Sequence, residues 1–189
     1  MKMGNISAIG RPLDPDYGTS RAIAIITGVV FLAGVIVQIL SGAGWLSGAR
    51  WGLSAGLTVF LSWALCRELD PDHDLSAFGA AGLGLVGLIL WGLPHLLTLF
   101  WMLLAVRTMN RTTGLHATVL DAVTLVALGG WLAFQRHWGY SVITAVAFLL
   151  DAHLAPALRR QLVFTGISAS IAVGAGLWAP VSISSGARR

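Results

Sequence analysis

Apolar residues in this chain occur in long runs that are separated by short polar segments. An α-helix needs about 20 predominantly apolar residues to cross the hydrocarbon core of a bilayer. The pattern predicts transmembrane helices over residues 22–40, 50–66, 115–134, 140–154 and 162–178. The segments between these runs are short and rich in glycine, proline or charged residues, as connections between helices commonly are.

The segment 75–106 is ambiguous because it holds 32 residues without a charge. That is long for one span of about 20 residues and short for two spans with a loop. It forms either two short helices joined by a turn at residues 91–94 or one long helix kinked at Pro94. Two helices of about 16 residues would each reach about 24 Å, which requires local thinning of the bilayer. The first alternative gives seven spans and the second gives six.

Charge placement favours seven spans with the N-terminus in the cytoplasm. Eight basic residues then share the cytoplasmic side and four lie opposite, whereas six spans divide them seven against five. An excess of basic residues on the cytoplasmic side is what membrane proteins show. The eight are Lys2, Arg11, Arg21, Arg67, Arg107, Arg111, Arg159 and Arg160. The seven-span arrangement also places all eight acidic residues on the cytoplasmic half and six tryptophans near the opposite interface, where aromatic side chains gather.

The composition fits a protein whose solvent is lipid. Hydrophobic residues make up 56% of the 189 residues and charged residues only 11%, against about 25% charged in soluble domains. Gly52 and Gly56 form a pair with the spacing typical of helix packing in lipid. We therefore expect an all-α polytopic transmembrane helix bundle, with residues 1–189 as a single integral membrane domain in a prokaryotic plasma membrane.

The chain ends are expected outside the bundle. Residues 1–21 carry several charges before the first apolar run, which is unlike a cleaved signal peptide and predicts a cytoplasmic N-terminal segment. Residues 180–189 form a C-terminal tail. The formal net charge of +4 does not indicate nucleic acid binding, because the basic residues are scattered at the ends of apolar runs. The expected partners are the lipid bilayer, other membrane subunits or a second copy of the chain. Cys66 is the only cysteine, so no intramolecular disulfide forms.

Asp121 is the most informative polar residue, because it falls in an otherwise apolar run. Asp121 lies six residues into its run and is expected about two turns below the inner surface. A carboxylate near a helix centre costs about 2.5–3.5 kcal/mol on insertion scales, so a partner or a cavity is expected. Asp151, Arg107 and Arg111 are predicted at a similar depth. The group is either a proton- or cation-coupled site, a phosphate site with arginine clamps, or a structural ion pair between helices.

Two further clusters carry one chemical and one structural interpretation each. Arg159 and Arg160 would bind lipid head groups or a phosphorylated substrate, or would only orient the chain. Asp70, Asp72 and Asp74 would ligate Mg²⁺. The structural alternative is helix capping, with an aspartate before a proline at the first helical position. The sequence repeats this Asp-Pro-Asp pattern at Asp14, Pro15 and Asp16.

The histidines give a weak cofactor hypothesis. His116 and His153 are predicted at the inner ends of their helices, and His95 and His137 near the outer face. Two histidines at one depth on different helices are the arrangement of a bis-histidine haem or pigment site. No histidine set has the ligand spacing of a zinc site.

The sequence carries no Walker loop, His-Glu-x-x-His, Gly-x-Ser-x-Gly or dinucleotide-binding fingerprint. We therefore expect a non-catalytic membrane component, either a small transporter or a subunit that packs against a larger complex. The alternative is an enzyme that acts with Mg²⁺ on a phosphorylated lipid at the inner leaflet.

Overall fold

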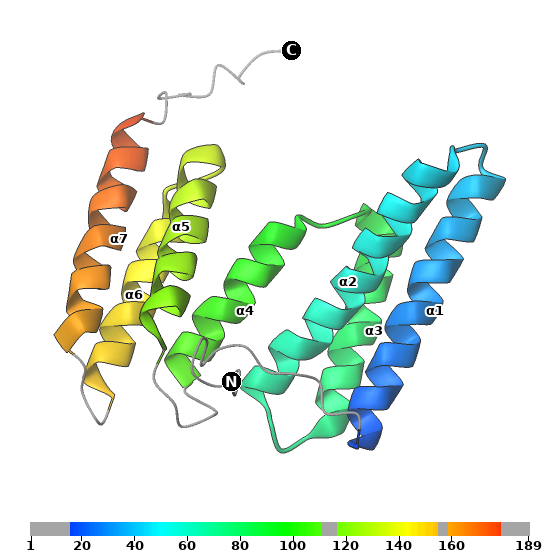
Figure 1. Cartoon of the computed structure of the whole chain (residues 1–189), viewed down its shortest axis with the longest axis horizontal. Helices are drawn as coiled ribbons and strands as arrows, with labels where there is room; N and C mark the ends of the chain where they lie inside the picture. Colours follow the sequence, from blue (N-terminus) through cyan, green and yellow to red (C-terminus); the bar gives the residue numbers. More distant parts are fainter. Residues whose placement is uncertain (1–15, 111–116, 155–158, 179–189) are drawn as a thin grey trace, which may run out of the picture. The chain divides into compact units, whose positions relative to one another are not determined.

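The computed structural model describes residues 16–110, 117–154 and 159–178. Within these residues the fold consists of seven α-helices and no strand (Figure 1). This confirms the all-helical prediction and the division of the chain into seven helices. The helices are α1 (Gly18–Leu40), α2 (Trp45–Leu69), α3 (Asp74–Trp91), α4 (Leu96–Asn110), α5 (Val119–Gln135), α6 (Gly139–His153) and α7 (Arg159–Trp178).

The uncharged segment 75–106 is broken into two helices at the predicted turn. α3 ends at Trp91, and Gly92 has a φ of 84°, in the left-handed region that favours glycine. Pro94 follows, and a proline disfavours helical geometry in the residue before it. The helix restarts at Leu96. One long kinked helix, the basis of the six-span alternative, is therefore excluded.

Three of the helices, α1, α3 and α7, are long and apolar enough to cross a membrane. Three is fewer than the seven spans that the sequence predicts. α2 has 25 residues but contains Arg50 within its length, and α4, α5 and α6 are apolar helices of only 15 to 17 residues. The three long helices suggest a membrane protein, while its placement in a prokaryotic plasma membrane stays a prediction.

The described chain divides into two compact units. The N-terminal unit holds α1, α2, α3 and the part of α4 up to Val106. The C-terminal unit holds the residues from Arg107 onward, with α5, α6 and α7. The prediction of a single membrane domain is neither confirmed nor contradicted by this division.

In the N-terminal unit, glycines of α2 face α1. A Cβ atom at Gly52 would lie 2.5 Å from the carbonyl oxygen of Phe31 and 2.7 Å from Val35 Cγ2. A Cβ atom at Gly56 would lie 3.0 Å from the carbonyl oxygen of Thr27. The two backbones thus approach closely at positions without side chains, as small residues allow in lipid. The predicted role of Gly52 and Gly56 in helix packing is confirmed.

The buried core of the N-terminal unit joins all four of its helices. α2 supplies most of the side chains, and α1, α3 and α4 contribute the rest. The cluster comprises Ile23, Val59, Leu61, Trp63, Ala64, Ala77, Ala81 and Leu103. α3 joins α2 through this core and through Gly84, where a Cβ atom would lie 2.5 Å from Ser62 Oγ.

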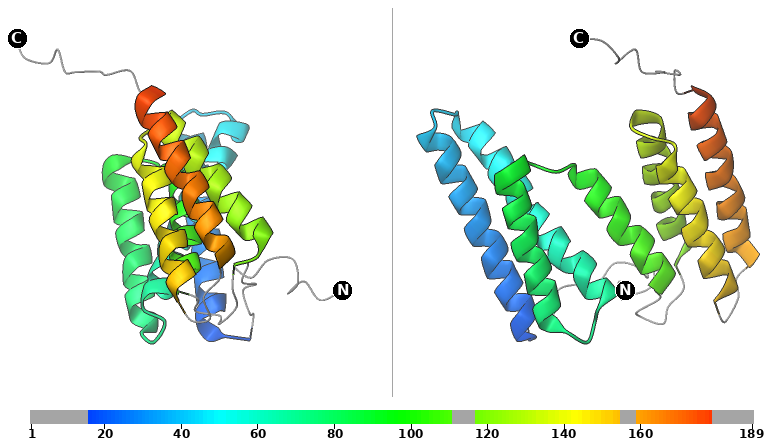
Figure 2. Two further views of the ribbon diagram at one scale, coloured as in Figure 1. Left: turned by 90° about the vertical axis from the view of Figure 1, so that its left-hand side faces the viewer. Right: turned by 180° about the vertical axis from the view of Figure 1, so that it is seen from behind.

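In the C-terminal unit, α5, α6 and α7 lie side by side (Figure 2). Phe148 and Leu125 are fully buried there. The hydroxyl of Ser141 on α6 donates a hydrogen bond of 3.2 Å to the carbonyl oxygen of Gly129 on α5. A Cβ atom at Gly130 would lie 3.4 Å from Ile171 Cδ1 on α7.

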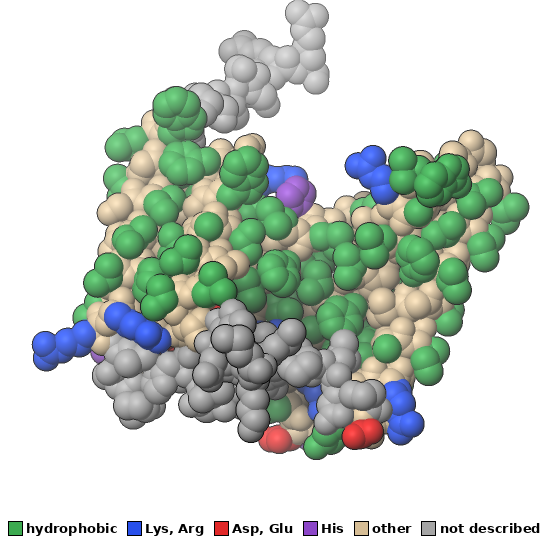
Figure 3. All heavy atoms as spheres, in the orientation of Figure 1, with side chains coloured by type: hydrophobic (Ala, Val, Ile, Leu, Met, Phe, Trp, Pro, Cys, Tyr) green, Lys and Arg blue, Asp and Glu red, His purple; other side chains and the backbone are tan. Residues whose placement is uncertain are grey.

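Large hydrophobic side chains cover the outer faces of the helices in both units (Figure 3). On α1, Ile25, Val29, Leu32 and Ile36 are each more than half exposed and share one face at helical spacing. Water-soluble monomers rarely expose apolar patches of this extent. The surface therefore fits contact with lipid or with another apolar partner.

Candidate functional site

A contact between two aromatic side chains shows how α6 is aligned against α7. The rings of Phe148 and Phe164 lie with centroids 5.4 Å apart. α6 and α7 are consecutive helices that run in opposite directions (Figure 1). Residues at equal distances from this ring pair along the two helices therefore lie at the same level.

Polar residues occupy matching levels on both sides of the ring pair. One turn toward the connecting loop, Asp151 on α6 is matched by Gln161 on α7. One turn the other way, Thr144 is matched by Ser168. Asp151 and Gln161 are 0% exposed, and Thr144 and Ser168 are 1% exposed. Each of these two helices thus buries two polar residues within the C-terminal unit.

Gln161 is the most unusual member of this set. Among the described residues, neither its Nε2 nor its Oε1 has a hydrogen-bond partner, and the same is true of Ser168 Oγ. Buried polar atoms without partners cost about 1–3 kcal/mol each, and they commonly bind an ordered water or an ion. The buried face of α7 therefore carries hydrogen-bonding capacity that the described side chains leave unused.

Asp121 does not lie where the sequence places it. α5 begins at Val119, four residues later than predicted, so Asp121 sits in the first helical turn instead of two turns deep. Its Oδ2 accepts hydrogen bonds from the backbone N–H and the hydroxyl of Thr118, at 3.0 and 2.9 Å. Thr118 Oγ1 in turn accepts from the N–H of Asp121. This reciprocal pair is a capping box, and its Thr-x-x-Asp signature is readable in the sequence.

Arg160 lies at the same end of the C-terminal unit as Asp151 and Asp121. Its guanidinium donates a hydrogen bond to the carbonyl oxygen of Ala117, directly before the capping residue Thr118. The start of α7 is thereby tied to the start of α5. Arg159 is exposed in the first turn of α7. Of the two arginines, Arg160 therefore has a structural contact, while head-group binding by either stays a prediction.

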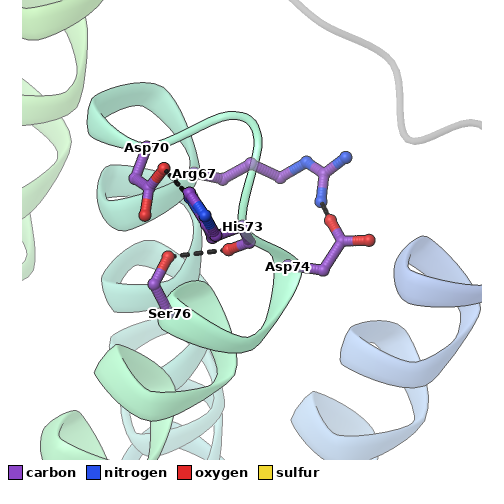
Figure 4. Close-up of polar contacts among 5 residues, drawn as sticks. All are labelled: Arg67, Asp70, His73, Asp74 and Ser76. Carbon is purple, nitrogen blue, oxygen red and sulfur yellow. Dashed lines mark hydrogen bonds and ion pairs between the residues drawn. The ribbon is translucent and has the colours of Figure 1, made fainter.

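The loop between α2 and α3 gathers the aspartates that were considered for Mg²⁺ (Figure 4). His73 Nδ1 lies 2.8 Å from Asp70 Oδ1, and Arg67 forms an ion pair with Asp74 (Figure 4). The hydrogen bond with Asp70 raises the pKa of His73 above its ordinary value of 6.5. The same bond lowers the pKa of Asp70 below its ordinary 3.8. Two of the three carboxylates are thus engaged by neighbours in their own loop.

The capping interpretation of Asp70 and Pro71 is wrong in its details. α3 begins at Asp74, and Pro71 lies in the preceding turn. Asp70 instead caps the end of α2, where its N–H donates to the carbonyl oxygen of Cys66. Asp70 takes this position because α2 continues to Leu69, which leaves a connection of only four residues before α3. Asp74 does lie in the first turn of α3, where a carboxylate complements the helix dipole.

In the described part of the chain, no group of three or more His, Cys, Asp or Glu side chains is arranged to hold a metal ion. The first Asp-Pro pair, Asp14 and Pro15, lies outside the described residues. Whether Asp70, Asp72 and Asp74 bind Mg²⁺ stays a prediction that the loop contacts do not favour.

The other predicted site residues that the structure describes, Arg107 and His153, lie in the last turns of their helices. Arg107 lies in the last turn of α4, and Arg111 lies outside the described residues. His153 is near the end of α6, where its Nδ1 is 2.7 Å from the carbonyl oxygen of Leu149. Its predicted porphyrin partner, His116, is outside the described residues. Three of the four residues of this predicted site are therefore described, namely Asp121, Asp151 and Arg107, and the two aspartates lie at one end of the C-terminal unit. The site itself stays a prediction.

Sequence reasoning missed Gln161 and Ser168. The signal was present, because the two polar residues are seven positions apart in an apolar helix and so share one face. The same holds for Thr144 and Asp151 on α6. Each residue alone is unremarkable in type, and only the pairing of the helices brings the four together. A comparison with known proteins finds no family model, no curated protein and no solved structure that matches this chain.

Proposed function

We propose that the protein is a small membrane transporter with seven spans, whose coupling site lies between α6 and α7 and is centred on Asp151. The observation that carries this proposal is the fully buried Asp151 at the level of Gln161, whose amide has no partner among the described residues. Ionisable groups inside membrane helices commonly mark proton or ion pathways. A hydrated proton or a hydrated monovalent cation would bring water molecules that can donate to and accept from the Gln161 amide, which has no partner among the described residues.

The separation of charged and aromatic ends within each unit supports the seven-span topology. In the N-terminal unit, Arg21, Arg67 and the acidic loop lie at one end of the helices, and Trp45 and Trp91 lie at the other. In the C-terminal unit, Arg159 and Arg160 begin α7, and Trp178 ends it. Such separation favours charged ends in the cytoplasm and tryptophans at the outer interface.

The short helices α4, α5 and α6 are compatible with this topology. Helices of 15 to 17 residues are about 22–26 Å long at 1.5 Å per residue. The hydrocarbon core is about 30 Å thick, and such a mismatch is met by local thinning and by flanking residues that reach the interface. We therefore count all seven helices as spans.

Transport is tested in lipid vesicles that contain the purified full-length protein and are loaded with a pH-sensitive dye. A pH gradient is then imposed without added cation, with external Na⁺ or with external K⁺. In at least one of these three conditions, the protein should make the gradient decay. Asp151→Asn should lower the rate at least tenfold, and Gln161→Leu should also lower it. Asp72→Asn, which changes an exposed loop carboxylate, is the matched control and should leave the rate unchanged. Equal rates for the Asp151→Asn variant and the unmodified protein would remove Asp151 from the proposal.

The second candidate is a packing subunit of a larger membrane complex. It is favoured by the exposed apolar stripe of α1, formed by Ile25, Val29, Leu32 and Ile36. A helix of another subunit would cover this stripe as well as lipid does. Gel filtration after gentle solubilisation from the native membrane distinguishes the two, because a packing subunit should elute with partners at fixed stoichiometry.

The enzyme hypothesis is the least supported of the three. Its carboxylates Asp70 and Asp74 are paired with His73 and Arg67 within an exposed loop. Mg²⁺-dependent hydrolysis of a phosphorylated lipid by the purified protein, lost in Asp70→Ala, would restore it.

A further inference from the structure

A stripe of four hydroxyl-bearing residues and one arginine runs along one face of α2. Successive members are three or four residues apart, which keeps them on one side of the helix. The stripe comprises Ser47, Arg50, Ser54, Thr58 and Ser62. Three of the hydroxyls donate to the carbonyl oxygen four residues earlier, at 2.8 to 2.9 Å. These hydroxyls already donate hydrogen bonds within α2. The inner part of the stripe, Thr58 and Ser62, therefore does not need a polar ligand.

The outer part of the stripe, which runs from Ser47 to Ser54, borders a hollow of about 440 Å³. Arg50 is the one charged residue in its lining, beside Ser47, Trp51 and Ser54. Within the part of the chain that the structure describes, Arg50 makes no ion pair with a carboxylate. The acidic loop that contains Asp70 lies beyond the opposite end of α2. An unpaired guanidinium beside hydroxyl and indole groups is complementary to a phosphate.

The inner part of the stripe borders a second hollow, of about 320 Å³. Thr58 and Ser62 line one side, and α3 lines the other with Gly84, Gly87 and Leu88. At Gly87 a Cβ atom would come no closer than 3.9 Å to any neighbouring side chain, so the groove is open there. The lining is predominantly apolar and suits a hydrocarbon chain.

The two hollows meet at Leu93, which lines both. All of their lining residues belong to the N-terminal unit. A cationic hollow that adjoins an apolar one matches a molecule with an anionic head and a hydrocarbon tail. A soluble anion would use only the first hollow, and a zwitterionic lipid would gain less from Arg50, because its ammonium group offsets the charge of its phosphate.

We propose that the α2 face binds one anionic phospholipid, with its phosphate on Arg50 and one acyl chain in the groove beside Gly84 and Gly87. The site lies at the tryptophan-rich end of the N-terminal unit, near Trp45 and Trp91, which is where lipid head groups meet such helices. The inference requires insertion in a membrane and is independent of transport at Asp151.

Native mass spectrometry of the delipidated full-length protein tests the site. Phosphatidylglycerol and phosphatidylcholine with identical chains are added in equal amounts. The expected result is one retained phosphatidylglycerol per protein, with at least tenfold preference over phosphatidylcholine. Arg50→Gln should abolish the preference, whereas Arg50→Lys should retain part of it. Arg136→Gln, which removes an exposed arginine after α5, is the matched control and should change nothing.

The tail and head of the ligand are tested separately. Gly87→Leu should lower phosphatidylglycerol retention severalfold, because its side chain enters the groove. Glycerophosphoglycerol, the head group without chains, should fail to displace the lipid at equal concentration. Equal retention of the two lipids, loss of preference in Arg136→Gln, or displacement by the bare head group would each overturn the proposal. A loss of transport in Asp151→Asn with lipid binding intact, or the reverse, separates this site from the proposed transport function.

Discussion

The α1–α2 and α6–α7 hairpins are built from similarly apolar helices but are held together by different means. Between α1 and α2, glycines bring the two backbones together, as at Gly52 against the carbonyl oxygen of Phe31. Between α6 and α7, an aromatic pair is in contact, and buried polar residues lie on either side of it, with Asp151 and Gln161 toward the connecting loop. The first interface is closed by backbone contact, and the second helix pair buries the Gln161 amide, which has no hydrogen-bond partner among the described residues.

This difference separates structure from candidate function. Lipid tails solvate apolar side chains as well as a protein does, so helices in a membrane associate through close packing and hydrogen bonds. A close contact at a glycine buries no polar side chain, so it needs no ligand. A buried amide without a partner does not, because lipid offers it no hydrogen bond. The α6–α7 hairpin is therefore where a polar substrate or ion has a physical reason to bind.

The largest effect is expected at the aromatic pair that spaces α6 and α7. Phe148 is fully buried and its ring contacts that of Phe164. Phe148→Ala should lower the free energy of unfolding by about 3–5 kcal/mol, the usual cost of removing a buried phenyl ring. Leu149→Ala, at an exposed neighbouring position, is the control and should cost about 0.5 kcal/mol or less. Unfolding in detergent with increasing dodecyl sulfate measures both. Similar losses in the two variants would mean that the ring pair does not hold the hairpin.

The next effect is expected at the glycine contact between α1 and α2. Gly52→Ala places a methyl group 2.5 Å from the Phe31 carbonyl oxygen, so the helices must separate, at a cost of about 1–3 kcal/mol. Gly82→Ala is the matched control, because no atom lies within 4 Å of its Cβ position. That control should be neutral or stabilising by about 0.5–1 kcal/mol, since alanine favours the helix. Thermal denaturation in detergent gives both values, and equal effects would refute the close approach of α1 and α2.

The sequence predicted the helices far better than the contacts between them. Apolar runs and the turn at Gly92 and Pro94 depend on local chemistry, and the seven-helix division follows from them. The depth of Asp121 was wrong because a capping box at Thr118, and not the first apolar residue, starts α5. That Gln161 lies at the level of Asp151 depends on the alignment of two helices, which no local pattern encodes. Sequence reasoning therefore identified Asp151 as a site residue but missed Gln161.

The smallest effect on stability is expected at the hydrogen bond between Asp70 and His73, in the loop between α2 and α3. The bond between Asp70 and His73 raises the pKa of His73 above 6.5 and lowers that of Asp70 below 3.8. The contribution of His73 to stability is complete below pH 6.5 and is lost as the pH rises through its raised pKa. The contribution of Asp70 is present above pH 3.8 and is lost as the pH falls through its lowered pKa. The pair is therefore complete between these two values.

Asp70→Asn should return the pKa of His73 toward 6.5, measured by NMR titration of the labelled imidazole in micelles. Asp72→Asn is the control and should lower the pKa less, because Asp72 acts on His73 only through charge at a distance. Since both partners are exposed to water, unfolding free energies should change little in either variant. A large loss of stability in Asp70→Asn would mean that loop contacts, and not only glycine packing, hold the N-terminal unit together, which would erase the contrast with α6 and α7.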